Sequence, residues 1–161
     1  MSDLSICRSA LIIFLLIGSC AHASCPTWPT EQRFQVNGAE VTDKQTGLVW
    51  ARCKVGHEWN GQSCVGGDPK MTHEEALKYA SGLSGWRLPN VKELASIADR
   101  GCPVEAIDKA AFPGIRGYEF WSSTPSLARN GSAWRVSFWF GDASPANRRD
   151  RYYVQLVRTN P

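Results

Sequence analysis

Arginines and a tryptophan near the C-terminal end of the chain are the residues whose type and spacing best suit binding chemistry. Residues 110–161 contain seven arginines, no lysine and only three acidic residues. A planar guanidinium makes paired hydrogen bonds to sulfate, phosphate or carboxylate groups, which a lysine cannot do. An aromatic platform beside guanidinium groups suits an acidic or sulfated polysaccharide, or a peptide that carries carboxylates. The candidate ligand-binding residues are therefore Arg135, Trp139, Arg148, Arg149 and Arg151.

The same residues also have a purely structural interpretation. In it, the arginines form a solvated, slightly basic surface, and Trp139 belongs to a second buried layer beneath the loop that follows it. The sequence leaves both interpretations open.

Residues suited to catalysis or metal binding are sparse. Asp142, Asn147 and Asp150 supply the hard oxygen ligands that calcium prefers, but three arginines in the same stretch oppose a cation. His73 precedes two glutamates without a second histidine four residues on, so the zincin pattern is not met. We therefore predict no catalytic residues, no metal and no cofactor, and a protein that is not an enzyme.

The N-terminal segment predicts export. Residues 10–18 are almost wholly apolar, follow Arg8 and are too short to span a bilayer, which is the layout of a secretory signal. Small residues around His22 form a cleavage site, so we predict a signal peptide over 1–23 and a single domain over 24–161. Alternatively, residues 16–20 resemble a lipobox in which Cys20 carries a lipid, the only membrane attachment we expect. Both routes give an extracytoplasmic location, in the periplasm, at the cell surface or outside the cell.

Four cysteines remain after either route, namely Cys25, Cys53, Cys64 and Cys102. An even number in an oxidising compartment predicts two disulfides, and four cysteines allow three connectivities. Cys53 and Cys64 enclose a short loop rich in glycine and asparagine, which favours this pair and leaves Cys25 with Cys102. A zinc site is the alternative, but no CxxC pair occurs in the chain.

Two helices are predicted from their N-terminal caps. Thr72 followed by Glu75 makes a capping box that opens a helix over 73–81, and Asn90 with Glu93 opens a second helix that ends at Gly101. The segment Gly85-Trp86-Arg87-Leu88-Pro89-Asn90 joins the helices, with Trp86 and Leu88 directed into the core. Arg87 then needs hydrogen-bond acceptors, so we predict a structural role for it.

Strands are predicted on either side of these helices. Residues 34–36 and 39–41 flank Asn37-Gly38, a type I′ hairpin signal, and 48–50 follow as the returning strand. Residues 120–124 and 132–140 read as further strands, with Arg135 and Trp139 on one face of the second. Residues 141–150 are predicted to be a polar loop, and 152–158 to close the sheet.

These motifs, in this order, resemble the Lcl C-terminal domain family of secreted bacterial domains. The resemblance extends over residues 30–158 and implies an α+β, C-type-lectin-like fold, stabilised by disulfides, in which two helices pack on a small twisted antiparallel sheet. The loop signatures of calcium-dependent sugar-binding lectins are not found in the sequence. The residues that carry the resemblance are Phe34, Val41–Asp43, Thr46–Cys53, Cys64, Gly66, Glu75–Leu77, Gly85–Asn90, Lys92–Leu94, Ile107-Asp108, Phe112-Pro113, Trp121–Thr124, Val154 and Leu156–Arg158.

Taken together, these features predict a non-enzymatic recognition module of the bacterial envelope or surface. Its expected partners are an envelope or surface protein, as for an adhesin or a surface-complex subunit, or an acidic polysaccharide. Nucleic acid is not expected, because the chain is exported and its net charge is only +3. The alternative is a structural or assembly factor of the cell envelope that binds no glycan.

Overall fold

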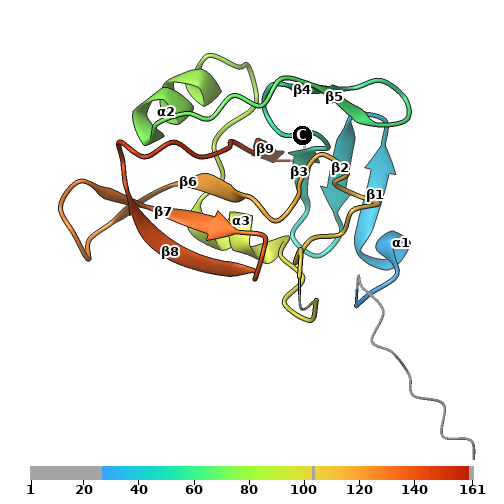
Figure 1. Ribbon diagram of the computed structural model, residues 1–161. Helices are drawn as coiled ribbons and strands as arrows, with labels where there is room; N and C mark the ends of the chain where they lie inside the picture. Colours follow the sequence, from blue (N-terminus) through green and yellow to red (C-terminus); the bar gives the residue numbers. More distant parts are fainter. Residues whose placement is uncertain (1–26, 103, 160–161) are drawn as a thin grey trace, which may run out of the picture.

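The computed structural model describes residues 27–102 and 104–159, which form three antiparallel sheets with short helices between them (Figure 1). The predicted signal peptide and the possible lipid site Cys20 lie outside the described residues. Within the described ranges, no helix is long and apolar enough to cross a membrane.

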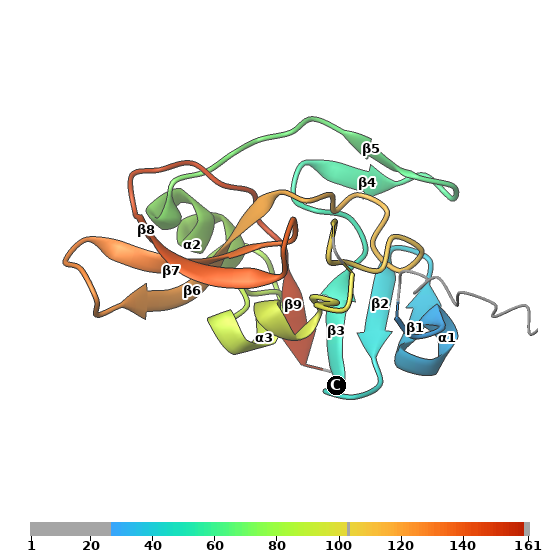
Figure 2. The ribbon, with the colours of Figure 1, turned by 60° about the horizontal axis from the view of Figure 1, so that its bottom comes forward.

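A four-stranded sheet is formed by β1 (Phe34–Asn37), β2 (Glu40–Asp43), β3 (Leu48–Ala51) and β9 (Val157–Thr159). The strands lie side by side in the order β1-β2-β3-β9, so the C-terminal strand returns to pair with β3 (Figure 2). The first hairpin is shifted by one residue from the prediction, because its two-residue loop is Gly38-Ala39. Gly38 has a φ of 56° whereas Ala39 keeps a negative φ, the pattern of a type II′ turn rather than type I′.

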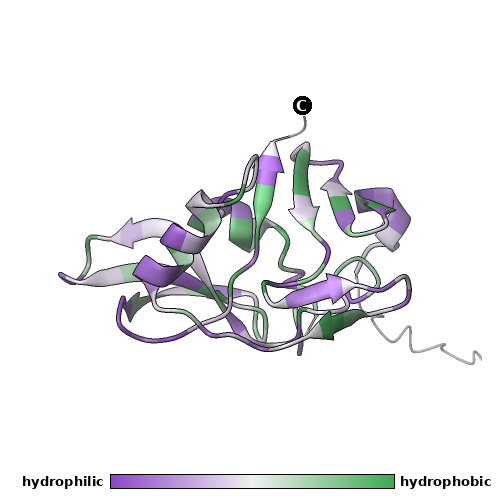
Figure 3. Ribbon diagram, turned by 90° about the horizontal axis from the view of Figure 1, so that it is seen from above, coloured by the Kyte–Doolittle hydropathy of each residue, from purple (hydrophilic) through white to green (hydrophobic). Residues whose placement is uncertain are grey.

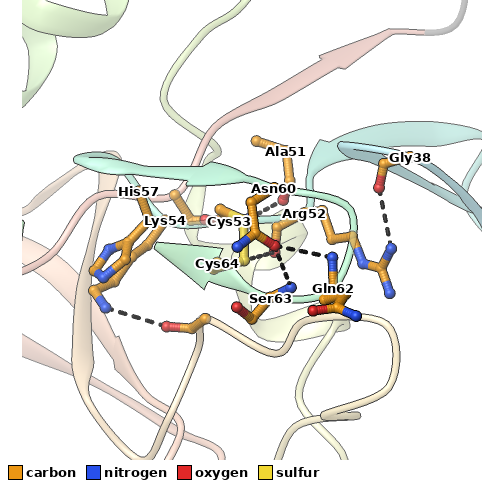
Figure 4. The surroundings of a disulfide bond; sticks show 12 residues. Gly38, Ala51, Arg52, Cys53, Lys54, His57, Asn60, Gln62, Ser63 and Cys64 are labelled. Atoms are coloured by element: carbon orange, nitrogen blue, oxygen red, sulfur yellow. Dashed lines mark hydrogen bonds between the residues drawn. A yellow bond between two sulfur atoms is a disulfide. The ribbon is translucent and has the colours of Figure 1, made fainter. Parts of the chain in front are cut away.

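A two-stranded sheet of β4 (His57–Trp59) and β5 (Cys64–Gly66) is joined by a disulfide to the segment that follows β3. The bond links Cys53 to Cys64, as predicted (Figure 4). Asn60 shapes the loop inside it by accepting hydrogen bonds from the backbone amides of Gln62 and Ser63, both at 2.9 Å. Cys25 lies outside the described residues, so the bridge from Cys25 to Cys102 stays a prediction.

A three-stranded sheet of β6 (Glu119–Ser126), β7 (Ser132–Ser137) and β8 (Asp142–Asn147) lies on the other side of the molecule (Figure 1). The prediction of a polar loop over 141–150 was wrong, because β8 pairs with β7 along all six of its residues. The composition of β8 does not indicate a strand, since Asp, Pro and Asn are depleted in strands. Pro145 is tolerated because β8 is an edge strand that has a neighbour on one side only.

The predicted fold class, two helices packed on one small sheet as in a C-type lectin, was also wrong. The structure is mostly β-sheet, and its helices are α1 (Thr30–Arg33), α2 (His73–Ser81) and α3 (Val91–Ser96). α1 is short and almost entirely hydrophilic (Figure 3). α3 ends before the predicted Gly101 because Ala98 leaves the helix to form a β-bridge with Ile107.

Both predicted capping boxes are present, at Thr72 with Glu75 and at Asn90 with Glu93. Each of these two helices nevertheless buries only a narrow stripe of side chains. α2 buries His73, Ala76 and Ala80, and α3 buries only Leu94. Such stripes cannot cover a sheet alone, so the rest of the core comes from the strands.

The buried side chains form two clusters on opposite sides of β6 and β7. The first core includes Leu94 of α3 with Phe120 and Val136, and the second includes Ala76 and Ala80 of α2 with Trp121. Consecutive residues of β6 thus face different cores, as the alternation of a strand requires. The other members of the second core are Val55, Leu88, Ala133, Val154 and Leu156.

The segment Gly85–Asn90 carries the chain from the second core to the first. Leu88 is buried and Trp86 half-buried, both in the second core, as predicted. Arg87 makes a two-bond ion pair with Glu93, with both N–O distances 2.7 Å, and its backbone bonds to Val157 of β9. The predicted structural role of Arg87 is confirmed.

Candidate functional site

The first candidate site is a hollow of about 660 Å³, which we call the arginine pocket. It lies where the N-terminus of α2, the β6–β7 turn and the exit of β8 meet. Two of the predicted residues, Arg148 and Arg149, line it. Its other lining residues are Thr72, His73, Glu74, Leu77, Asn130, Gly131 and Asn147.

Backbone and side-chain hydrogen bonds fix the turn that carries the two arginines. The Arg148 amide donates to the carbonyl of Gly131 at 2.9 Å, and its Nε donates to the carbonyl of Ser132 at 3.2 Å. The Arg149 amide donates to Oδ1 of Asn147 at 3.0 Å, and the residue is exposed. Both arginines thus start from a turn whose backbone is held by hydrogen bonds.

His73 forms part of the wall of this pocket and is 3% exposed. Its Nε2 lies 3.0 Å from the carbonyl oxygen of Ser122, so the ring donates a hydrogen bond there. Burial lowers the pKa of His73, and the nearby Arg148 lowers it further. His73 is therefore neutral at pH 7, and the positive charge of the pocket comes from Arg148 and Arg149.

Two other predicted arginines are held by carboxylates. Arg151 donates to Oε1 of Glu75 and to the carbonyl of Lys70, both at 2.9 Å. Arg135 pairs with Glu119 at 2.6 Å and lies over the ring of Tyr152, 5.4 Å from its centroid. Neither of them lines the arginine pocket.

Trp139 lies at the opposite end of the β7–β8 hairpin. The predicted strand over 132–140 ends at Ser137, because a turn closed by the Gly141 amide on the Ser137 carbonyl follows it. Arg148 adjoins the other end of β8, so the six-residue strand, about 17 Å long, separates it from the tryptophan. The structure therefore does not bring Trp139 together with Arg148 and Arg149.

Trp139 instead lines a second hollow of about 440 Å³, which we call the aromatic pocket. The indole is 45% exposed, so the interpretation of Trp139 as a buried residue is wrong. Sequence reasoning missed the rest of this pocket, although the adjacent aromatic pairs 139–140 and 152–153 were a signal for it. The other lining residues are Lys70, Gly117, Tyr118, Glu119, Ser137, Phe140, Tyr152 and Tyr153.

The three possible calcium ligands do not gather in one loop. Asp142 begins β8 and Asn147 ends it, so the strand holds their side chains apart. Over residues 27–102 and 104–159, no group of three or more His, Cys, Asp or Glu side chains is placed to hold a metal ion.

A comparison with protein families matches residues 39–158 to the Lcl C-terminal domain. The chain belongs to the Lcl C-terminal domain family. This membership indicates a secreted bacterial surface domain, and no curated protein matches the chain. Every residue that lines the two pockets of this Lcl C-terminal domain falls within the matched range.

Proposed function

We propose that this domain is a non-enzymatic recognition module of the bacterial envelope or surface that binds an acidic or sulfated polysaccharide through the arginine pocket. The observation that supports this proposal most directly is the placement of Arg148 and Arg149 in one hollow beside a single carboxylate, that of Glu74. Guanidinium groups on a fixed turn can meet sulfate or carboxylate oxygens with paired hydrogen bonds.

The net charge of the chain does not by itself support polyanion binding at the arginine pocket. The net charge of the chain is only +3, and exposed charges are screened beyond about 8–10 Å at physiological salt. A polyanion would therefore bind where guanidinium groups are grouped and free of carboxylate partners. Arg149 meets this condition better than Arg151, whose guanidinium is held by Glu75.

A matched pair of variants tests the proposal. Arg149→Ala and Arg151→Ala remove the same charge from positions two residues apart, but only the first residue lines the pocket. On a heparin column eluted with a salt gradient, the wild-type protein should be retained and Arg149→Ala should elute at clearly lower salt. Arg151→Ala should stay close to wild type.

Equal losses in both variants would show a diffuse basic surface and contradict the pocket. No retention on heparin and no signal on a glycan array, together with co-purification of one envelope protein, would favour the structural or assembly role instead. The lipidated form is a separate proposal, which the intact mass of the exported protein tests by the presence or absence of a lipid on Cys20.

A further inference from the structure

The aromatic pocket contains a close contact between a tryptophan and a glycine, which the arginine pocket does not. Trp139 lies directly against Gly117, since a Cβ atom at position 117 would fall 2.2 Å from Cε3 of the indole. Only glycine therefore leaves room for the ring in this position. The neighbouring rings of Tyr118 and Tyr153 lie 4.7 Å apart with an interplanar angle of 36°.

The exposed faces of this pocket are aromatic. Trp139 is 45% exposed, Phe140 65% and Tyr118 37%, while Tyr153 is buried beneath them. Large exposed aromatic side chains gathered around one hollow are typical of ligand sites rather than of an ordinary surface.

The charged groups around the hollow indicate which ligands the pocket disfavours. The ammonium of Lys70, which lines the hollow, lies 5.1 Å from the centroid of the Tyr153 ring. Glu119, the acidic residue of the lining, is already paired with Arg135. A cationic ligand would therefore meet the ammonium of Lys70 and no unpaired carboxylate in the lining.

Among the other kinds of ligand, one with a flat apolar face and a polar edge fits these residues. A pyranose ring has both, because its axial C–H bonds can pack on an indole while its hydroxyls project sideways. The ammonium of Lys70 and the tyrosine hydroxyls offer hydrogen bonds to such an edge. A volume of about 440 Å³ also lies within the usual range for small-ligand sites, roughly 300–1,000 Å³.

We propose that the aromatic pocket is a second binding site, which takes one pyranose ring, neutral or acidic, stacked on Trp139. Lys70 hydrogen bonds to an oxygen at the edge of the sugar, and Gly117 is a positioning residue that lets the indole lie flat. The two pockets have no lining residue in common. The inference is therefore independent of polyanion binding at the arginine pocket.

The test uses the purified protein with methyl glycosides of glucose, galactose, N-acetylglucosamine and glucuronic acid. Saturation-transfer NMR should show saturable binding of at least one of them, with little change between 50 and 500 mM NaCl. Trp139→Ala should weaken this binding at least tenfold, and Gly117→Ala should weaken it without removing any pocket side chain. Trp28→Ala is the matched control, because Trp28 is also exposed, at 54%, but does not line the pocket.

Thermal unfolding of each variant separates loss of binding from loss of the fold. Trp139→Phe keeps an aromatic ring, so its affinity should lie between those of wild type and Trp139→Ala. Absence of saturable binding to all four glycosides, or equal binding by wild type and Trp139→Ala, would overturn the proposal. Strong salt sensitivity that follows Arg149→Ala would also overturn it, because the sugar would then occupy the arginine pocket.

Discussion

At the scale of single residues, most arginines of this domain serve as cross-links within the fold. Arg158 pairs with Glu40 at 2.8 Å. Arg87 likewise pairs with Glu93 at 2.7 Å, and Arg135 with Glu119 at 2.6 Å. An exposed ion pair adds little stability, typically below about 1 kcal/mol, but it removes a guanidinium from the set available to a ligand. The number of arginines in the last third of the sequence is therefore larger than the number available to a ligand. Arg149 is a candidate because it lines the arginine pocket.

His73 makes the stability of the domain depend on pH. Burial lowers its pKa below the ordinary value of 6.5, so the folded state holds the neutral ring. Above pH 6.5 both states are neutral and His73 adds no pH dependence. Below it, the unfolded chain binds a proton that the folded chain does not, and the free energy of unfolding falls until the lower, folded pKa is reached.

The slope of this loss should stay below about 1.4 kcal/mol per pH unit, the limit for a difference of one bound proton. His73→Gln can still donate a hydrogen bond to Ser122 but does not titrate, so its pH dependence should be smaller. Urea unfolding of both proteins at pH 7.5 and pH 5.0 measures the difference. Parallel pH dependences of the two proteins would contradict the assignment to His73.

At the scale of the elements, local chemistry decides which parts could be predicted. The helix starts follow from side chains that bond within four residues, so Thr72 and Asn90 were readable from the sequence. β8 was not, because its strand conformation comes from pairing with β7 and not from its own residues. The aromatic pocket was missed for the same reason, since Lys70, Gly117 and Trp139 meet only through the tertiary fold.

The start of α2 provides a test of this local control. The Thr72 hydroxyl accepts from the Glu75 amide at 3.3 Å, and Glu75 Oε2 accepts from the Thr72 amide at 2.8 Å. Thr72→Ala removes the first bond and should lower the free energy of unfolding by about 1 kcal/mol. Thr72→Ser keeps a hydroxyl at the cap and should stay within a few tenths of a kcal/mol of wild type. Urea unfolding measures both, and equal losses would show that the methyl group of Thr72, not its cap, stabilises the helix.

At the scale of the whole molecule, β6 and β7 join the two cores into one unit. Phe120 and Val136 belong to the first core, while Trp121 and Ala133, on the same two strands, belong to the second. Neither core can lose its packing without exposing a strand that the other core needs. We therefore expect the domain to unfold in a single transition, as single domains of this size usually do.

One substitution in each core tests this coupling. Leu94 and Val154 are at most 1% exposed and lie in the first and second core, respectively. Leu94→Ala should cost about 2–5 kcal/mol and Val154→Ala about 2 kcal/mol, from lost burial and the cavity left behind. Amide hydrogen exchange should show that Leu94→Ala also lowers protection in the second core, at the Val55 amide bonded to Val154. If protection there stayed at the wild-type level, the two cores would open independently, and the shared strands would not transmit the loss.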